Sequence, residues 1–501
     1  SGHSERKNHR TETGMKLLKD ILFGLRLREV LGSTHVAIDG VTSDSRAVRK
    51  ASLFVAIRGT HVDGHQFIAQ AAQQGACAVV CEELPTSPVT GVTYLCVPET
   101  TEAYALLAAN WFGRPAEKMK VVGVTGTNGK TTTATLLHQL YQHQGIKSGL
   151  LSTVRIVIHH KEIPATHTTP DAWALQSYLA QMLEAGCKIV FMEVSSHGLI
   201  QNRVVGIPFA GAVFSNISRD HLDYHQTMDA YVAAKKRLFD GLGPQAFALV
   251  NIDDVHGETM LLDCKGKAIT YALKRTADIK VRILESHLNG TLMSVNQREC
   301  WMHLIGAFNV YNAAAIYGAA TALGMPADEA LQGISALHSV DGRFQRVDGP
   351  IGIVGIVDYA HTPDALENVL QALQGFRQGP QRILTVVGCG GDRDKGKRPQ
   401  MAQIAADLSD YVVFTSDNPR SESPSAILKD MEDGLDPLQK RRCIAIEDRA
   451  QGIKLACQYA QAGDILLVAG KGHEKYQDIE GVKHPFDDVA VLKSTLKDVH
   501  A

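Results

Sequence analysis

The chain has 501 residues, 45% of them hydrophobic and 21% charged, which is enough for about three soluble globular domains. Its 51 basic and 53 acidic side chains give a net charge of -2, so composition provides no electrostatic case for nucleic acid or an anionic membrane as the main partner. No apolar run reaches the roughly 18 residues of a membrane span. The nine cysteines contain no CxxC pair, which predicts free thiols in a cytoplasmic protein.

The beginning of the chain combines a polar leader with a small domain. Residues 1–14, SGHSERKNHRTETG, are polar and precede the first Met, which is typical of a tag or a disordered tail rather than a signal peptide. Residues 15–113 then alternate short β-rich runs with helical patterns. This alternation predicts a small N-terminal α/β domain.

A phosphate-binding loop opens the next part of the chain, residues 114–341. The strand KVVGVT from Lys120 runs into a glycine-rich turn and then into a helix through His143. In this arrangement backbone N–H groups and the helix N-terminus face an anion, Lys130 neutralises it, and Thr131 offers a hydroxyl to Mg²⁺. The strict GxxxxGK spacing fails, because Val124 stands where the first glycine should be. The flanking strand and helix nevertheless predict phosphate binding.

Glu193 ends the apolar strand IVFMEV. A carboxylate at the tip of a buried strand beside a phosphate loop is well placed to bind Mg²⁺. The alternative is a solvated acid at the end of a strand.

The helix DAYVAAKKRLF contains two adjacent lysines that helical phase separates. Tyr231, Ala234, Lys235, Leu238 and Phe239 share one face, whereas the next lysine lies about 100° round the helix. Lys235 is therefore predicted to point inward, where a buried amine needs a partner or becomes reactive. A lysine in an ion pair is the simpler interpretation.

An alanine-rich helix begins with GAFNVYN, which places Asn309 and Asn312 one turn apart. Amide side chains at this spacing can bind an adenine edge, or Asn309 can simply cap the helix.

The last part, residues 342–501, contains four apolar strands that each run into a polar or glycine-rich loop. Helical stretches separate them, which predicts a doubly wound parallel sheet with a ligand site at the carboxyl ends of its strands. In the loop SDNPRSE, Arg420 follows a turn-forming Asn-Pro step, and its planar guanidinium can pair with a carboxylate. The alternative for Arg420 is a surface salt bridge.

The motif GTNGKTT is similar to the ATP loop of the Mur ligase superfamily, and the chain from about Met15 resembles that superfamily through all three predicted domains. Within it, the chain resembles the branch that adds the third amino acid of the peptidoglycan stem peptide. The resemblance implies an α/β fold of three domains: a small N-terminal α/β domain that binds the UDP-sugar, a central P-loop ATPase-like domain with a parallel sheet, and a C-terminal Rossmann-like domain that binds an amino acid.

The resemblance also implies the residues that bind ATP and Mg²⁺. Family members use positions matching Glu193, His221 and Lys235 at the metal, with Lys235 carbamylated by CO₂, together with Thr131 and Lys130. Arg343 in DGRFQ matches the position that contacts the ATP phosphates, and Asp358 in VDYAHTPD matches the position that contacts the ribose. The ATP-binding set implied in this way is Gly126, Thr127, Asn128, Gly129, Lys130, Thr131, Thr132, Asn309, Asn312, Arg343 and Asp358.

Two further sets follow from the resemblance. Hydroxyl, amide and guanidinium groups suit a UDP-sugar dipeptide rich in oxygen atoms, and this set is Ser43, Ser45, Thr60, His61, Thr168, Thr169, Ser195, Gln201 and Arg203. The DNPR pattern accompanies meso-diaminopimelate, whose distal carboxylate lysine lacks, and this set is Arg393, Asp417, Asn418, Pro419, Arg420, Gly470 and Glu474.

We therefore expect a monomeric, ATP-dependent carbon–nitrogen ligase with small-molecule substrates. A lysine-adding relative, another Mur ligase or a folylpolyglutamate synthetase would share the loop but would not be expected to carry DNPR. A nucleotide-dependent switch of the GTPase kind would carry an NKxD motif, which is absent. Intact Lys130, Glu193, His221 and Lys235 speak against a binding protein that has lost catalysis.

Overall fold

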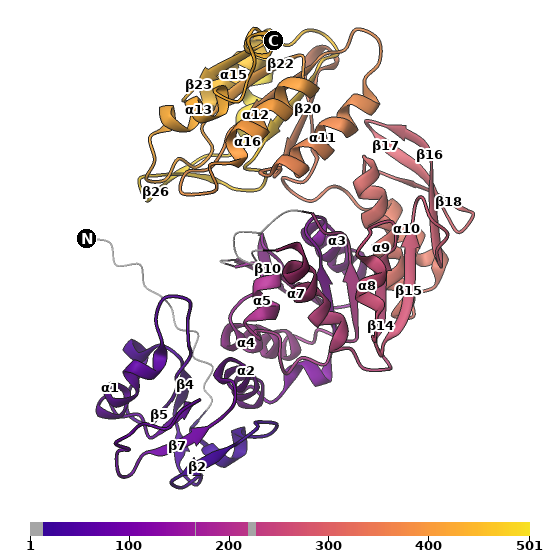
Figure 1. Cartoon of the computed structure of the whole chain (residues 1–501). Helices are drawn as coiled ribbons and strands as arrows, with labels where there is room; N and C mark the ends of the chain where they lie inside the picture. The colour runs from indigo at the N-terminus through magenta and orange to yellow at the C-terminus, as the bar shows by residue number, and fades with distance from the viewer. Residues whose placement is uncertain (1–13, 166, 219–226) are drawn as a thin grey trace. The chain divides into compact units, whose positions relative to one another are not determined.

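The computed structural model describes residues 14–165, 167–218 and 227–501 of the chain (Figure 1). Helices and strands alternate throughout, and the strands form three large sheets and two small ones, so the predicted α/β class is confirmed. Contacts between Cα atoms divide the chain into two compact units. The first comprises Ser1–Gly123 and Lys147–Ala210, and the second comprises Val124–Ile146 and Gly211–Ala501.

The first unit begins with a five-stranded sheet in the order β2-β7-β6-β5-β4, in which β4 to β7 are parallel. Its central strand β6 is buried on both faces, because alternate residues of β6 enter two different apolar clusters. The elements are β1 (Lys16–Leu17), β2 (Glu29–Leu31), β3 (Ala37–Ile38), β4 (Gly40–Thr42), β5 (Ser52–Val55), α1 (Ile68–Gln73), β6 (Ala78–Cys81), β7 (Thr93–Cys96) and α2 (Thr100–Trp111). Short 3-10 helices lie at Leu18–Ile21, Ser45–Ala47, Gly64–Phe67 and Pro115–Lys118.

The rest of the first unit contains the strands β11-β10-β9-β12-β8, which begin an 11-stranded sheet. Here β9 and β12 are parallel, whereas β10 and β11 return as antiparallel strands. The elements are β8 (Lys120–Thr125), which continues into the second unit, β9 (Ser148–Leu151), β10 (Arg155–Ile158), β11 (Lys161–Pro164), α4 (Ala172–Glu184), β12 (Ile189–Glu193) and α5 (Ser196–Ile200).

In the second unit the strand order from β8 is β8-β13-β14-β15-β16-β17-β18. Strands β13 to β16 are parallel, and β16 to β18 form an antiparallel meander. The elements are α3 (Lys130–His143), β13 (Gly211–Phe214), α7 (Met228–Asp240), β14 (Phe247–Asn251), α8 (Gly257–Leu261), β15 (Lys267–Ala272), β16 (Ile279–His287), β17 (Gly290–Val295), β18 (Arg298–Met302), α9 (Ala307–Ala322) and α10 (Ala327–Ser335). The stretch from residue 252 to residue 299, which reads as polar and turn-rich, thus contains four strands.

The remaining sheet has the order β19-β20-β24-β21-β22-β23, in which only β19 is antiparallel to its neighbour. The elements are β19 (Gln345–Asp348), β20 (Val354–Asp358), α11 (Pro363–Phe376), β21 (Ile383–Val387), α12 (Lys397–Leu408), β22 (Tyr411–Thr415), α13 (Pro424–Glu432), α14 (Pro437–Lys440), β23 (Cys443–Ile446), α15 (Arg449–Tyr459), β24 (Ile465–Ala469), β25 (Tyr476–Ile479), β26 (Val482–Pro485) and α16 (Asp488–Val499), with a 3-10 helix at Pro350–Gly352. The four predicted apolar strands are β20, β21, β22 and β24. All four are parallel, so their polar loops leave from one edge.

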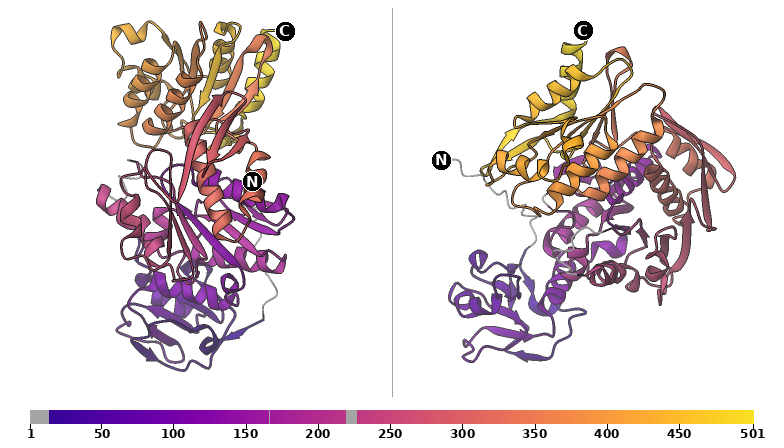
Figure 2. Two further views of the ribbon diagram at one scale, coloured as in Figure 1. Left: turned by 90° about the vertical axis from the view of Figure 1, so that its right-hand side faces the viewer. Right: turned by 45° about the horizontal axis from the view of Figure 1, so that its top comes forward.

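Helices cover both faces of this last sheet, as the orange to yellow part of Figures 1 and 2 shows. Along β24, Ile465, Leu467 and Ala469 enter one apolar cluster with residues of α11 to α13, while Leu466 and Val468 enter another with residues of α15 and α16. β24 is the last of the sheet's six strands in the sequence, yet it lies between β20 and β21. Across the described residues, no helix combines the length and apolar character needed to cross a membrane.

Candidate functional site

The phosphate loop lies between β8 and the N-terminus of α3, as the sequence predicts. Gly126 has a φ of 145°, and a Cβ atom there would come within 1.9 Å of the Ser215 Oγ, so only glycine fits. Gly129 caps the helix with a φ of 88°. The Lys130 Nζ donates to the carbonyl oxygens of Gly126 at 2.7 Å and Thr127 at 3.2 Å, so its cationic group lies over the loop.

Side chains from the end of β13 hold the loop in place. The Ser215 Oγ donates to the Asn128 carbonyl at 2.6 Å, and the Asn216 Oδ1 accepts from the Asn128 N–H at 3.0 Å. On the other side, the hydroxyls of Thr127 and Tyr231 are 3.0 Å apart. Ser215, Asn216 and Tyr231 are therefore parts of this site that motif reasoning did not assign to the loop.

Lys235 points inward from α7, as helical phase predicts. Its side chain is 1% exposed, whereas Lys236 is partly exposed and pairs with Asp240. The Lys235 Nζ donates to the Gly126 carbonyl at 2.9 Å and lies 4.7 Å from the centre of the Tyr231 ring. The structure thus brings two lysines, Lys130 and Lys235, to the same loop carbonyl.

The two predicted asparagines are buried beside the loop at the start of α9. The Asn312 Nδ2 donates to the Asn309 Oδ1 at 3.1 Å, and the Asn309 Nδ2 donates to the Ile305 carbonyl at 2.9 Å. The Asn312 Oδ1 accepts from the Thr133 Oγ1 at 3.4 Å. A chain of amides therefore connects α9 to the first turn of α3.

Arg343 reaches the phosphate loop from the segment that precedes β19. Its Nη2 donates to the Thr131 Oγ1 at 3.3 Å, and its guanidinium lies 4.6 Å from the centre of the Tyr359 ring. Its buried Nε has no hydrogen-bond partner. The Asp358 carboxylate instead accepts hydrogen bonds from the N–H groups of Phe344 and Ala360, both at 2.7 Å. It therefore fixes the backbone next to Arg343. Burial raises the pKa of Asp358, although Arg343 opposes this.

In the first unit, several residues predicted to bind the UDP-sugar lie together around the end of β12. The Thr169 Oγ1 donates to the Glu193 carbonyl at 3.2 Å and accepts from the Ser195 N–H at 2.9 Å. Arg203 donates through Nη1 to the Thr169 carbonyl at 2.8 Å and through Nη2 to the Gln201 Oε1 at 2.6 Å. The Thr168 hydroxyl accepts from the Thr153 Oγ1 at 3.1 Å.

Glu193 belongs to the same cluster. Its side chain is 1% exposed, and its carboxylate accepts the Thr153 N–H at 2.5 Å and the Thr153 Oγ1 at 3.2 Å. It is therefore a buried acid rather than a solvated one. His221 lies outside the described residues. Within those residues, no group of three or more His, Cys, Asp and Glu side chains could hold a metal ion.

The predicted contacts to the other end of the UDP-sugar lie near the five-stranded sheet. Ser43 follows β4, close to Tyr104; burial raises the pKa of the Tyr104 hydroxyl, and Ser43 acts in the opposite direction. Ser45 opens a 3-10 helix. Thr60 and His61 lie in an exposed loop after β5. The binding role of these four residues stays a prediction.

The Arg420 loop follows β22, and the β25–β26 hairpin holds it. The Arg420 N–H donates to the Asp478 carbonyl at 2.9 Å, and the Arg420 carbonyl accepts from the Glu480 N–H at 2.8 Å. These bonds fix Arg420 in a left-handed conformation with a φ of 53°. Its Nη1 donates to the Gly391 carbonyl at 2.8 Å. The Asn-Pro step is thus only one of the features that orient Arg420.

The other residues predicted for the amino acid lie around the same loop. Gly470, at the end of β24, has a φ of 116° and would bring a Cβ within 2.8 Å of the Asp417 Oδ2. The Glu474 Oε1 accepts from the Asn418 Nδ2 at 3.3 Å. Arg393 is exposed, and its Nη1 donates to the Asp392 carbonyl at 3.0 Å.

Sequence reasoning missed three buried cations near this edge. Lys471 is fully buried between Asp417 and Glu474. Arg449 is fully buried, pairs with Asp488, and donates to the Ser416 carbonyl at 3.1 Å. Arg398 pairs with Glu422 and Asp430 and donates to the Gly390 carbonyl at 3.1 Å. Each lies in a polar loop or at the start of a helix, as surface charges do. What distinguishes it is an acid that is distant in the sequence but close in the fold.

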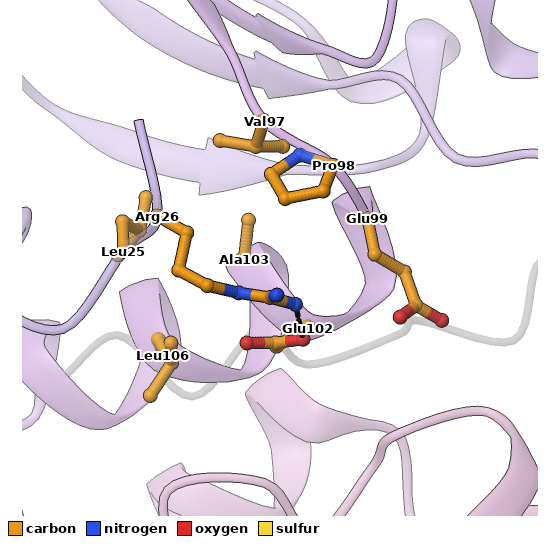
Figure 3. A pocket seen from close by; sticks show the side chains of 8 residues that line it. All are labelled: Leu25, Arg26, Val97, Pro98, Glu99, Glu102, Ala103 and Leu106. Carbon is orange, nitrogen blue, oxygen red and sulfur yellow. Dashed lines mark hydrogen bonds and ion pairs between the residues drawn. The ribbon is translucent and has the colours of Figure 1, made fainter. Parts of the chain in front are cut away.

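A small pocket lies elsewhere in the first unit, between α2 and the segment around Leu25 (Figure 3). The Arg26 Nη2 pairs with the Glu102 Oε2 at 2.7 Å within it. None of the residues predicted to bind a substrate lines this pocket.

Comparison with known proteins covers nearly the whole chain. Residues 37–111, 124–320 and 342–472 match the families described as "Mur ligase family, catalytic domain", "Mur ligase middle domain" and "Mur ligase, glutamate ligase domain". The chain is 50% identical over 476 residues to the UDP-N-acetylmuramoyl-L-alanyl-D-glutamate--2,6-diaminopimelate ligase of Parabacteroides distasonis, covering 95% of this chain and 98% of that protein. It is 49% identical over 480 residues to the ligase of the same name from Cytophaga hutchinsonii, covering 96% and 99%. A solved structure of a ligase of this name is 34% identical, has a TM-score of 0.70, and matches over 97% of this chain and 100% of that one.

Proposed function

Because this chain belongs to the Mur ligase family, we propose that it is an ATP-dependent amide ligase. It joins meso-2,6-diaminopimelate to the γ-carboxylate of the D-glutamyl residue in UDP-N-acetylmuramoyl-L-alanyl-D-glutamate, a step of peptidoglycan precursor synthesis. The observation that carries the proposal is the match to ligases of this name, at about half identity and over nearly the full length of both chains. We expect it to act as a monomer in the cytoplasm, where ATP and nucleotide sugars are available.

The phosphate loop is proposed to bind ATP. The N-terminus of α3 and the loop N–H groups suit the phosphates, and Lys130 lies over the loop to neutralise their charge. Arg343, whose guanidinium is at the Thr131 hydroxyl, would stabilise charge on the transferred phosphoryl group. Asn309 and Asn312 would contact the adenine end and Asp358 the ribose.

Mg²⁺ prefers oxygen ligands, and two residues of the predicted set supply them: the Thr131 hydroxyl and the buried Glu193 carboxylate. Lys235 as an amine donates hydrogen bonds and cannot bind a cation, whereas its carbamate would provide two oxygens that share one negative charge. The donor chemistry of these residues therefore suits Mg²⁺ when Lys235 is carbamylated. When bound, the metal would neutralise charge on the ATP phosphates.

The nucleotide-sugar dipeptide is proposed to bind at the cluster of hydroxyl, amide and guanidinium groups around β12. Arg203, held by Thr169 and Gln201, is the cation of this cluster that can pair with a substrate carboxylate or phosphate. Thr168, Ser195 and the loops with Ser43, Ser45, Thr60 and His61 would provide further polar contacts.

The Arg420 loop is proposed to select the incoming amino acid. A guanidinium that is half-buried against the Gly391 carbonyl can pair with the distal carboxylate of diaminopimelate. L-lysine lacks this carboxylate and would leave Arg420 without its anion, which discriminates strongly between the two. Glu474 would contact the ammonium end, whereas the Asn418 amide N–H groups and Arg393 would contact a carboxylate.

The chemistry has two steps. A γ-carboxylate oxygen of the substrate first attacks the terminal phosphorus of ATP, which forms an acyl phosphate and releases ADP. The diaminopimelate amine then attacks the acyl carbon, the carbon–oxygen bond to phosphate breaks, and the amine loses a proton to solvent or base. No covalent bond to the protein forms, so the residues act by positioning the reactants and neutralising charge.

A phosphate-release assay with a panel of amino acids tests the proposal. With ATP and the nucleotide-sugar dipeptide present, we expect release with meso-diaminopimelate to exceed release with L-lysine by on the order of a hundredfold or more. Arg420→Ala should remove this preference, because the group that distinguishes the two amino acids is gone. Arg441→Ala, at an exposed arginine after α14, is the matched control and should keep it.

Two outcomes would contradict the proposal. Phosphate release at the full rate without the nucleotide sugar would exclude the ligase reaction. Equal rates with diaminopimelate and L-lysine would exclude the assignment of Arg420 and point to an enzyme of different amino-acid specificity.

A further inference from the structure

Lys471 lies at the carboxyl end of β24, between Gly470 and Gly472. Its side chain has no exposed surface. A fully buried ammonium group is costly unless charged and polar partners surround it. The partners of Lys471 therefore indicate what this lysine does.

Three oxygen atoms surround the Lys471 Nζ. The Asn418 Oδ1 lies at 2.7 Å, the Asp417 Oδ1 at 3.3 Å and the Glu474 Oε1 at 3.4 Å. All three residues belong to the set proposed to bind the amino acid. Because Lys471 itself has no exposed surface, it can act on the substrate only through these neighbours.

Lys471 fixes the orientation of the Asn418 amide. An ammonium group only donates hydrogen bonds, so the carbonyl oxygen of the amide must face it. The same oxygen accepts the Asp478 N–H at 2.9 Å. The Asn418 Nδ2 is then directed to the Glu474 Oε1 at 3.3 Å. Lys471 and the Asp478 N–H thus set the direction of the Asn418 amide together, and through it the bond from Asn418 to Glu474.

Lys471 also acts on the charge of Glu474. Burial raises the pKa of the Glu474 carboxyl, the negative charge of Asp417 acts in the same direction, and Lys471 opposes both. Tyr359 and Tyr476 are the other titratable groups facing this carboxyl, and the buried Arg449 is a further nearby cation. Without Lys471, Glu474 would keep its proton to higher pH and would pair less well with an ammonium group.

We infer that Lys471 is a positioning residue for the amino-acid substrate: it holds Asn418 and Glu474 so that the Glu474 carboxylate can pair with the substrate's ammonium group. The inference rests on the proposed function, because it assumes that Asn418 and Glu474 contact the amino acid. It adds a residue that does not touch the substrate itself.

Lys471→Met tests the inference, since it keeps the length of the side chain and removes the charge. We expect the KM for meso-diaminopimelate to rise at least about tenfold, with the KM for ATP changed less than twofold. The pH at which the KM for diaminopimelate begins to rise on acidification should move upward, because Glu474 takes up its proton at higher pH. A purely structural role would lower the amount of active enzyme without moving this pH profile.

Two further variants keep the test decisive. Lys475→Met removes an exposed lysine, whose Nζ is 3.2 Å from the Asp487 carboxylate, and it should leave both constants and the pH profile unchanged. If Lys471→Met does not fold, as judged by thermal melting, Lys471→Gln replaces it. Glutamine can still donate a hydrogen bond to Asn418 but carries no charge. We therefore expect this variant to lose the effect of the charge on the pH profile.

The outcomes separate this inference from the proposed function. If the unaltered protein releases no phosphate with diaminopimelate, the proposed function fails before any variant is measured. If the unaltered protein is active and the folded Lys471 variant keeps its KM for diaminopimelate and its pH profile, the inference is overturned while the proposed function stands.

Discussion

The phosphate loop and the Arg420 loop both follow the carboxyl ends of parallel strands, but different forces hold them. Around the phosphate loop, the groups that accept hydrogen bonds are mainly backbone carbonyls, and Lys130, Lys235 and Ser215 all donate to them. Around the Arg420 loop, the buried ion pairs of Lys471 and Arg398 add to the backbone bonds that the β25–β26 hairpin makes.

The difference indicates which substitutions would disrupt each loop. Backbone carbonyls are present whatever the sequence, so the phosphate loop depends on glycines that let the chain approach closely. Removing one partner of a buried ion pair strongly destabilises the fold, because the other charge then lies buried without a partner. We therefore expect the two loops to fail independently, and in different ways.

The largest effect should come from Lys130→Met. Loss of the cation over the loop should reduce phosphate release by on the order of 10²–10³-fold, because charge on the transferred phosphoryl group is then less stabilised. Binding of diaminopimelate, measured by calorimetry with the nucleotide sugar present, should be unchanged. Lys120→Met, at an exposed lysine that starts β8, is the matched control. A joint loss of amino-acid binding would show that the two loops are not independent.

A smaller effect is expected from Gly391→Ala. A Cβ atom at this position would come 1.8 Å from the Pro419 carbonyl oxygen, so the Arg420 loop must shift. Overpacking of this kind costs about 1–3 kcal/mol, and it should raise the KM for diaminopimelate while leaving the KM for ATP unchanged. Gly375→Ala in α11 is the control, since a Cβ there meets nothing within 4 Å. An equal rise in both KM values would argue that the loops are mechanically joined.

The smallest effect concerns Glu422, the partner of Arg398. Arg398, together with hydrogen bonds from the Asp392 N–H and Lys395, lowers the pKa of the Glu422 carboxyl to about 2 from an ordinary value of 4.5. A lowered pKa stabilises the fold above the ordinary value, and this contribution is lost as the pH falls through about 2.

Glu422→Gln should therefore lower the free energy of unfolding at neutral pH by about 1 kcal/mol, allowing for solvent screening. Denaturant titrations at several pH values would measure it. The difference from the unaltered protein should shrink between pH 4.5 and about 2, and a constant difference across this range would contradict the assignment.

Much of the phosphate-binding region could be predicted from the sequence because its determinants are local. The strand, the turn and the helix of the loop are contiguous, and the inward direction of Lys235 follows from helical phase alone. The four apolar strands of the last sheet were predictable for the same reason, since each is a short apolar run that ends in a polar loop. The family resemblance that the motifs indicated is confirmed by the near full-length matches.

The support of the Arg420 loop could not be predicted because it depends on distant segments. Lys471, Arg398 and the β25–β26 hairpin each meet this loop only after the sheet has formed. The strands β16 to β18 were also missed, because they form an antiparallel meander that has many polar residues, exposed along most of β16, and close turns. The roles of the individual site residues stay predictions.

The position of β24 has a consequence for how the protein is made. During synthesis the ribosome releases β20 and β21 well before β24, and these two strands do not pair with each other. Until residue 469 has emerged, both therefore keep an apolar edge open, of the kind that aggregates or recruits chaperones. Insertion of β24 closes both edges and carries Lys471 to Asp417 in the same event. A prematurely ended chain would keep its phosphate loop but would have no amino-acid site, and its open edges would mark it for removal.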